Sequence, residues 1–283
     1  MTDAPISGLS AIADDYDAIL CDVWGVLHNG VAAHDAASDA LARFRQTGKP
    51  VVLLTNAPRP SGPVIDQLMR LGALRDAFDT VVSSGDVVRQ HLIDEGFRRV
   101  YHLGPSRDLT LYDGTAIELV NSADEADAIV GTDMRSDDEV PADYSDEIAA
   151  LSALSVPFIC ANPDIVVERG GDIVYCGGAL AKIYEDMGGM ARQFGKPHAP
   201  IYKMALGRIA EIAPDAKRVL AIGDGLPTDI TGANRQGLDV LFITNGIHVH
   251  ELGENGVPDP AKVRERLGKE GLSASHFIAK LGW

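Results

Sequence analysis

Residues 16–29 read YDAILCDVWGVLHN, and the order of side chains in this stretch decides the fold. Ile19, Leu20 and Cys21 form a short apolar run that ends at the acid Asp22, and Gly25 follows three residues later. Such a run is typical of a buried parallel strand with a functional loop at its end. In open α/β sheets ligands bind at the carboxyl ends of strands, where Asp22 would lie. The alternative is a solvated aspartate in a turn, since Asp and Gly are common loop residues.

Strand-like and helix-like segments alternate in the first part of the chain and again in the last part. Apolar runs occupy residues 50–54, 80–83, 218–222 and 239–244, and helical spacing marks residues 64–72, 84–95, 199–213, 261–268 and 273–281. Another helix follows Gly30 and ends at Gly48, and a short one starts near Pro227. Residues 4–15 are expected to form a short helix or arm. This alternation predicts a doubly wound, parallel α/β sheet with right-handed crossovers.

The middle of the chain has shorter apolar runs and longer polar stretches than its two ends. Short candidate strands at residues 99–103, 117–120, 128–130 and 157–160, and a candidate helix at 144–155, are separated by acidic, polar stretches. We therefore predict that residues 87–190 form a second α/β unit, inserted into a core made of residues 1–86 and 191–283.

The composition bears on the partners of the protein and on its cellular compartment. The 283 residues carry a formal net charge of −16, which argues against nucleic acid or an anionic membrane surface as the main partner. The three cysteines lie in or beside apolar runs without a CxxC pair, as in a cytosolic protein with reduced thiols. The first residues lack a signal-peptide pattern and no apolar run is long enough to span a membrane, so we expect a cytoplasmic protein.

Three predicted strands end in chemically capable side chains: Asp22, Thr55 with Asn56, and Asp224. Lys196 stands in FGKP (194–197), just before a predicted helix. The carboxyl ends of parallel strands share one edge of the sheet, so these groups can converge there. Two adjacent carboxylates repel each other unless a cation lies between them, and their hard oxygens suit Mg²⁺. A lysine and a threonine beside such a metal suit a phosphoryl group.

Each of these signals has a plainer explanation when taken alone. Lys196 could be a surface lysine, and Thr55 with Asn56 a polar turn. Asp229 could be a first-turn acid that the helix dipole stabilises. His248 and His250 stand two apart in HVHE, which is a weak metal motif without a third strong ligand. Because the motifs occur together in this order, we favour one shared site over these separate explanations.

The ordered motifs resemble the haloacid dehalogenase (HAD) superfamily of phosphatases. They are DxxGV at residues 22–26, LLTN at 53–56, GKP at 195–197 and GDxxxxD at 223–229. The insert resembles the class IIA cap of that superfamily through residues 131–133, 161–164 and 177–180. Class IIA includes p-nitrophenyl phosphatases, pyridoxal phosphatases and a sugar-phosphate phosphatase group. The resemblance thus implies a Rossmann-like HAD core with an inserted α/β cap, and a homodimer formed through the caps.

The resemblance also implies a role for each motif residue. Asp22 would be the nucleophile that forms an aspartyl-phosphate, with Lys196 as the second catalytic group. The metal ligands and the phosphate-binding residues follow from the same match: Asp22, Asp224, Asp229 and the main-chain carbonyl of Trp24 for Mg²⁺, and Thr55, Asn56, Lys196 and Gly225 for the phosphoryl oxygens.

Trp24 departs from the family pattern. Phosphatases of the superfamily usually carry a second aspartate there, which protonates the leaving group, and indole has no such acid–base chemistry. General acid–base catalysis contributes about 10²- to 10⁴-fold in rate, so we expect weak activity on alkyl esters. His28 is a candidate substitute because imidazole titrates near neutral pH. The alternative for His28 is a loop histidine exposed to water.

Three functions fit these residues. The first is a Mg²⁺-dependent phosphatase acting on a small phosphorylated metabolite. The second is a dehalogenase-like hydrolase, because that branch also has an aromatic residue two after the nucleophile. The third is a non-catalytic protein that binds a phosphometabolite. We favour the phosphatase, and Asn162, Asp164 and Asp133 are candidate substrate contacts in the cap.

Overall fold

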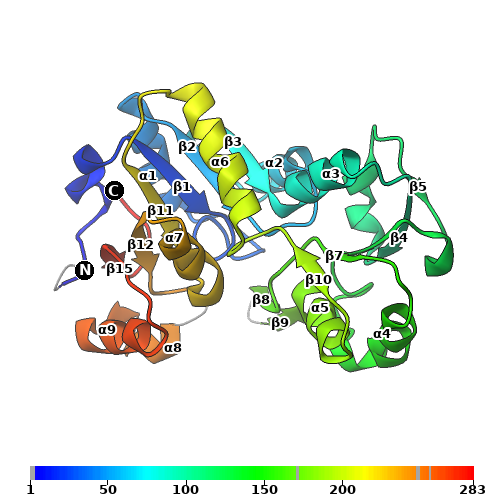
Figure 1. Ribbon diagram of the computed structural model, residues 1–283. Helices are drawn as coiled ribbons and strands as arrows, with labels where there is room; N and C mark the ends of the chain where they lie inside the picture. Colours follow the sequence, from blue (N-terminus) through cyan, green and yellow to red (C-terminus); the bar gives the residue numbers. More distant parts are fainter. Residues whose placement is uncertain (1–3, 170–171, 247–248, 255) are drawn as a thin grey trace. The chain divides into compact units, whose positions relative to one another are not determined.

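The computed structural model describes residues 4–169, 172–246, 249–254 and 256–283, so His248 lies outside the described residues. Contacts divide the chain into two compact units (Figure 1). The first contains Met1–Thr55, Ile65–Val82 and Tyr202–Trp283, and the second contains Asn56–Val64 and Ser83–Ile201. The second unit is therefore inserted into the first. The boundaries at residues 87 and 190 stay a prediction.

The first unit is built on a six-stranded sheet with the strand order β15-β12-β11-β1-β2-β3. Strand β1 pairs in parallel with both β11 and β2, and β12 pairs in parallel with β11 and β15. The strands are β1 (Ala18–Asp22), β2 (Val51–Thr55), β3 (Thr80–Ser83), β11 (Val219–Gly223), β12 (Asp239–Ile243) and β15 (His276–Ile278). All five residues of β1 and of β2 are buried, which explains their unbroken apolar runs.

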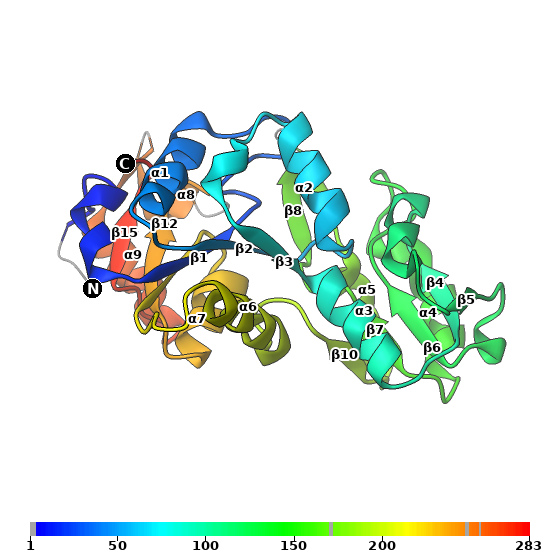
Figure 2. The same ribbon diagram turned by 90° about the horizontal axis from the view of Figure 1, so that it is seen from above.

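Helices cover both faces of this sheet. Figure 2 shows α1 on one face and α6 and α7 on the opposite face, the arrangement of a doubly wound fold. The helices are α1 (Asp35–Gln46), α2 (Ser61–Arg70), α6 (Ala199–Ile212), α7 (Thr231–Arg235), α8 (Val249–Leu252) and α9 (Pro260–Lys269), and β13 (Gly253–Glu254) pairs with β14 (Val257–Pro258). The expected α/β fold class is confirmed.

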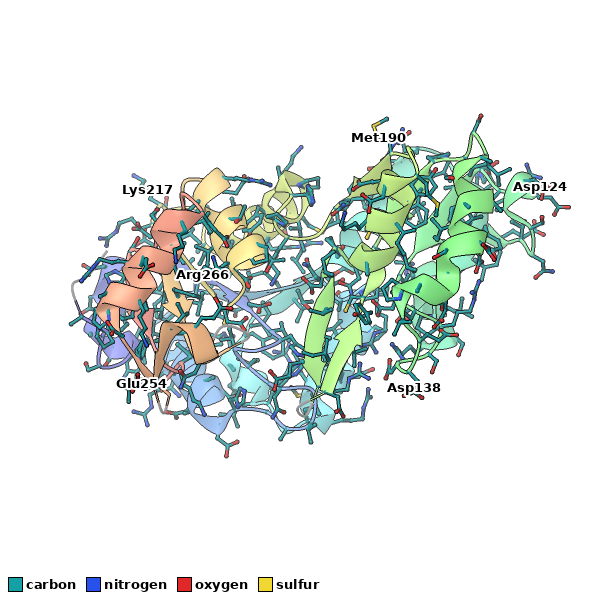
Figure 3. The ribbon with its side chains drawn as sticks, turned by 90° about the horizontal axis from the view of Figure 1, so that it is seen from below. Asp124, Asp138, Met190, Lys217, Glu254 and Arg266 are labelled. Atoms are coloured by element: carbon teal, nitrogen blue, oxygen red, sulfur yellow. The ribbon has the colours of Figure 1, made fainter. Side chains whose placement is uncertain are left out.

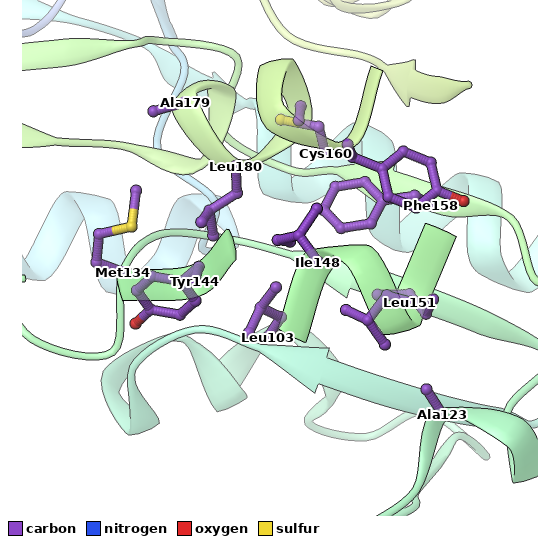
Figure 4. Packing of buried hydrophobic residues seen from close by; sticks show 13 residues of the cluster. Leu103, Ala123, Met134, Tyr144, Ile148, Leu151, Phe158, Cys160, Ala179 and Leu180 are labelled. Atoms are coloured by element: carbon purple, nitrogen blue, oxygen red, sulfur yellow. The ribbon is translucent and has the colours of Figure 1, made fainter. Parts of the chain in front are cut away.

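The second unit has its own parallel sheet, with the order β10-β7-β6-β4-β5. Its elements are α3 (Ser84–Asp94), β4 (Arg99–Leu103), β5 (Glu118–Leu119), β6 (Ala128–Gly131), α4 (Ser145–Ser152), β7 (Phe158–Cys160), β8 (Val166–Arg169), β9 (Asp172–Tyr175), α5 (Gly177–Asp186) and β10 (Ala191–Gln193). Figure 4 shows the core that α4 and α5 form with this sheet, in which Ile148 and Leu180 pack beside Phe158. The rings of Phe158 and Tyr184 stack with centroids 4.7 Å apart.

Two sequence predictions about secondary structure differ from the structure. The expected helix at residues 273–281 is wrong, because His276–Ile278 forms strand β15 on the edge beside β12. A short apolar segment lacks a diagnostic period, and pairing with β12 decides its conformation. Helix α5 was missed because it begins with Gly177 and Gly178, which usually mark a break. A Cβ atom on Gly178 would lie 2.3 Å from the carbonyl oxygen of Pro163, so the close approach requires glycine.

The cysteines, the surface charges and the lengths of the helices bear on the expectations from composition. The three cysteines are buried and free, as predicted. Charged side chains such as Asp124 and Asp138 project from the surface of the second unit, as does Met190 (Figure 3). None of the helices in the described part of the chain has the length and apolar character that a membrane span requires.

Asp79, the residue before β3, binds the first residue of β2 and a side chain of α1. Its carboxylate accepts hydrogen bonds from Val51 N at 2.8 Å and from Arg45 Nε at 2.9 Å. We expect Asp79→Ala to lower the free energy of unfolding by about 2 kcal/mol, because it leaves a buried backbone N–H and a guanidinium without their acceptor.

Urea unfolding followed by tryptophan fluorescence measures this loss, since Trp24 and Trp283 both lie in the first unit. The control is Asp39→Ala, which removes an exposed i,i+4 pair with Arg43 and should leave the midpoint nearly unchanged. Equal midpoints for the two variants would contradict the role given to Asp79.

Candidate active site

The centre of the first unit's sheet brings two of the predicted acids together. Asp22 is the last residue of β1, and Asp224 follows the last residue of the neighbouring strand β11. Cys21 is level with Ile222 in the parallel register, so both acids emerge from the same edge. Both acids therefore lie at the carboxyl edge of the sheet, where we expected them from the apolar runs that precede them.

A third acid, Asp229, completes a cluster with Asp22 and Asp224. One carboxylate oxygen from each residue lies within 4.8 Å of those of the other two, and the residues are only 6–8% exposed. Among the described residues this is the one group of three acidic, histidine or cysteine side chains arranged to share an ion. Buried carboxylates at this spacing repel one another, and a bound cation removes the repulsion. An all-oxygen donor set suits Mg²⁺.

A turn of π-helix, Leu226–Ile230, returns Asp229 to the strand end. The Gly225 N–H donates to Asp229 Oδ2 at 3.1 Å, and the Gly225 carbonyl accepts from Asp229 N at 2.9 Å. A Cβ atom on Gly223 would lie 2.3 Å from Asp229 Cβ. The spacing GDxxxxD therefore places a buried acid against the first glycine, rather than a solvated acid on a helix. π-Helical turns of this kind are frequent at functional sites.

Two glycines make room for Asp224. A Cβ atom would lie 2.4 Å from Asp224 Oδ2 if placed on Gly25, and 1.8 Å from it if placed on Gly246. Gly25 also has φ = +87°, a conformation that L side chains rarely adopt. Sequence reasoning missed Gly246. Its signal was the polar exit Thr244-Asn245-Gly246 after β12, which resembles the exit Thr55-Asn56 after β2.

The loop after β1 is tight and holds Trp24 against His28. The Gly25 N–H donates to the His28 carbonyl at 2.8 Å, and the Leu27 N–H donates to the Val23 carbonyl at 2.8 Å. The rings of Trp24 and His28 meet edge to face, with centroids 4.9 Å apart. The indole thus packs within its own loop.

His28 does not have the properties of a proton donor. It is 2% exposed rather than open to water, and its Nδ1 accepts the Gly30 N–H at 2.9 Å, so Nε2 carries the proton of the neutral ring. Burial, followed by the charge of His34, lowers the pKa of His28 to about 4. The neutral ring therefore predominates at pH 7. The structure argues against His28 as the missing acid.

The predicted phosphate-binding residues divide between the two units. Thr55 is the last residue of β2 and is buried. In the parallel pairing of β1 with β2, Asp22 lies opposite Leu54, so Thr55 is one residue beyond the partner of the candidate nucleophile. Asn56 and Lys196 belong to the second unit and are each 3% exposed. Lys196 is therefore not a surface lysine.

The three candidate cap residues form one polar group in the second unit. Asn162 Nδ2 donates to Asp133 Oδ1 at 2.8 Å, and Asn162 Oδ1 accepts the Asp164 N–H at 3.2 Å. Asp133 Oδ1 also accepts the Gly177 N–H at 3.1 Å, so Asp133 and Asn162 are held both by each other and by backbone groups. Their proposed contact with substrate stays a prediction.

Comparisons with known proteins agree with this architecture. Residues 19–118 match the family described as haloacid dehalogenase-like hydrolase, and residues 193–269 match one described as HAD-hydrolase-like. A crystal structure of a haloacid dehalogenase-like hydrolase from Brucella suis 1330 aligns with a TM-score of 0.86 and 43% identity, covering 98% of this chain and 99% of that one.

Two further relatives carry names that describe their activity. The ribonucleotide monophosphatase NagD of Escherichia coli K12 is 27% identical over 81% of this chain and 88% of its own length. A Mycobacterium tuberculosis glycerol phosphate phosphatase, solved in complex with magnesium, aligns with a TM-score of 0.64 and 25% identity, over 83% of this chain and 70% of that one.

The family resemblance drawn from the four motifs is therefore confirmed over nearly the whole chain. The match to the Brucella suis protein and the two family matches, one on each side of the insert, show that this chain belongs to the haloacid dehalogenase-like hydrolase family, with an α/β core and an inserted cap domain.

Proposed function

We propose that this chain is a Mg²⁺-dependent phosphatase that hydrolyses a small phosphorylated metabolite through an aspartyl-phosphate on Asp22. The cluster of Asp22, Asp224 and Asp229 is the observation that carries the proposal, because three buried carboxylates whose oxygens lie this close together can share one cation, which offsets their repulsion. The phosphatase names of several relatives support the same substrate class.

The chain's own residues supply the steps. One Asp22 oxygen attacks phosphorus, the ester P–O bond breaks, and its electron pair leaves with the alcohol oxygen, which takes up a proton from solvent because residue 24 supplies no acid. Water then attacks phosphorus, the P–O bond to Asp22 breaks, the carboxylate is restored, and inorganic phosphate leaves as the water gives up a proton to solvent. Thr55 and Lys196 would hold phosphoryl oxygens by a hydrogen bond and a positive charge. Mg²⁺, held by Asp22, Asp224, Asp229 and the Trp24 carbonyl, would offset the negative charge of the phosphoryl group.

Two other functions are weighed against the same cluster. Displacement of a halide from carbon needs no metal, so a dehalogenase would have no use for Asp224 and Asp229 beside Asp22. A protein that binds a phosphometabolite without turnover would keep the cluster, and Trp24 fits that reading. Turnover separates it from the phosphatase.

We expect phosphate release from p-nitrophenyl phosphate that requires Mg²⁺ and stops with chelator. Asp22→Asn should reduce the rate by about 10³-fold or more, because it removes the nucleophile while keeping the shape of the side chain. Asp66→Asn, on the exposed side of α2, is the matched control and should change nothing. Turnover that survives in Asp22→Asn would contradict the mechanism.

Trp24 sets the range of leaving groups. We expect Trp24→Asp to raise the rate on alkyl phosphates by about 10²-fold, because the new carboxyl group can protonate a poor leaving group. The rate on p-nitrophenyl phosphate should change far less, since that leaving group needs little protonation. Comparing kcat/KM for the two esters in both proteins measures the effect, and an equal change on both esters would refute this assignment.

Gly246 offers a test of the metal site that needs no turnover. We expect Gly246→Ala to weaken Mg²⁺ binding by about tenfold, because the added methyl group occupies the position of the Asp224 carboxylate. Isothermal titration with Mg²⁺ measures this change. Gly207→Ala is the control, because a Cβ atom at this exposed position of α6 meets nothing within 4 Å. Equal affinity in both variants would show that Asp224 does not bind the ion.

A further inference from the structure

The side chain of Asn56 holds the main chain of Lys196 on both sides. Asn56 Oδ1 accepts the Lys196 N–H at 2.6 Å, and Asn56 Nδ2 donates to the Lys196 carbonyl at 3.1 Å. Both residues are 3% exposed, so water does not compete for these bonds. All of these atoms belong to the second unit.

The remaining amide hydrogen of Asn56 goes to a carboxylate. Asn56 Nδ2 donates to Asp164 Oδ1 at 2.9 Å. A carboxylate accepts and does not donate, so Asp164 fixes which end of the amide faces Lys196. With the opposite orientation, the amide oxygen would face the carboxylate and the NH₂ group would face the Lys196 N–H.

This count leaves the Asn56 side chain no hydrogen for a ligand. An asparagine amide has two N–H hydrogens, and here one reaches Asp164 and the other reaches the Lys196 carbonyl. Asn56 therefore differs from a residue that offers its side chain to a phosphoryl oxygen. Its hydrogen bonds go to the main chain of Lys196 and to the Asp164 carboxylate.

Asp164 is itself held in place by a loop that the rest of the second unit fixes. Asn162 Oδ1 accepts the Asp164 N–H at 3.2 Å, and the Asp164 carbonyl accepts the Gly178 N–H at 3.0 Å. Asn162 Nδ2 reaches Asp133 Oδ1 at 2.8 Å, and the same oxygen accepts the Gly177 N–H at 3.1 Å. A continuous chain of hydrogen bonds thus runs from the start of α5 to the backbone of Lys196.

Glycine is required where this chain meets the lysine loop. A Cβ atom on Gly195 would lie 2.4 Å from Asn56 Oδ1 and 2.8 Å from Pro163 Cδ. The glycine before Lys196 therefore permits the close approach of both the asparagine and the Pro163-Asp164 loop. The GKP and ANPD sequences are parts of one packed arrangement.

We propose that Asn56 and Asp164 are positioning residues that set the place of Lys196, with Asp164 orienting the Asn56 amide and that amide clamping the Lys196 main chain. This inference rests on the proposed function, in which Lys196 holds phosphoryl oxygens. It gives Asp164, a residue of the inserted unit, control over a residue of the catalytic motif set. It also gives Asn56 a different role from that of a phosphate ligand.

The test exchanges the two functional groups. Asn56→Asp removes both donated hydrogen bonds and sets two carboxylates against each other. The double variant Asn56→Asp/Asp164→Asn restores a hydrogen bond with its direction reversed. Asn121→Asp, at an exposed site of the same unit, is the matched control.

The first readout is hydrogen exchange at the Lys196 amide, measured residue by residue by NMR. We expect exchange about tenfold faster in Asn56→Asp, because repulsion from Asp164 and from the Lys196 carbonyl moves the acceptor oxygen away from the Lys196 N–H. The double variant removes the repulsion from residue 164 and should recover part of the protection. The second readout is the affinity for inorganic phosphate with Mg²⁺, which should weaken about tenfold in Asn56→Asp and recover in the double variant. The affinity for Mg²⁺ alone should stay constant.

Each contrary result is informative. Unchanged exchange in Asn56→Asp, or a double variant no better than the single one, would overturn the clamp. Faster exchange with unchanged phosphate affinity would overturn the positioning role. If the wild-type protein bound no phosphate while the exchange pattern held, the proposed function would fail, and the role of the clamp in it would fail too.

Discussion

Mutual repulsion among three buried carboxylates is the constraint on which the rest of this structure depends. Asp22, Asp224 and Asp229 are nearly inaccessible to water, so solvent screens their charges poorly. A cation bound between the three carboxylates offsets this repulsion. The proposed metal binding and chemistry would therefore be linked to stability at one edge of one sheet.

The backbone around the cluster is shaped to hold it. Gly25 and Gly246 leave the volume that the Asp224 carboxylate occupies, and the π-helical turn brings Asp229 back to Gly223. In the second unit, the Asn56 amide likewise holds Lys196 by two hydrogen bonds to its main chain. In both places residues with a proposed chemical role are fixed by neighbours to which no such role is given.

Much of this arrangement follows from the sequence because parallel strands impose it. An apolar run that stops at an acid, as at Asp22 or Asp224, specifies both a strand and the edge where the acid lies. The burial of His28 and the space required at Gly246 do not follow, because they depend on contacts between segments far apart in the chain. The strand at residues 276–278 was mistaken for a helix for the same reason: pairing with β12 is a tertiary contact.

A crystal structure of the protein with Mg²⁺ and inorganic phosphate would show whether the three carboxylates bind a metal ion. We expect one ion bound by Asp22 and Asp224, with oxygens at about 2.0–2.1 Å and Asp229 in or beside its shell. The phosphate should lie within reach of the second Asp22 oxygen. An ion bound elsewhere, or these three carboxylates without a metal at saturating Mg²⁺, would contradict this expectation.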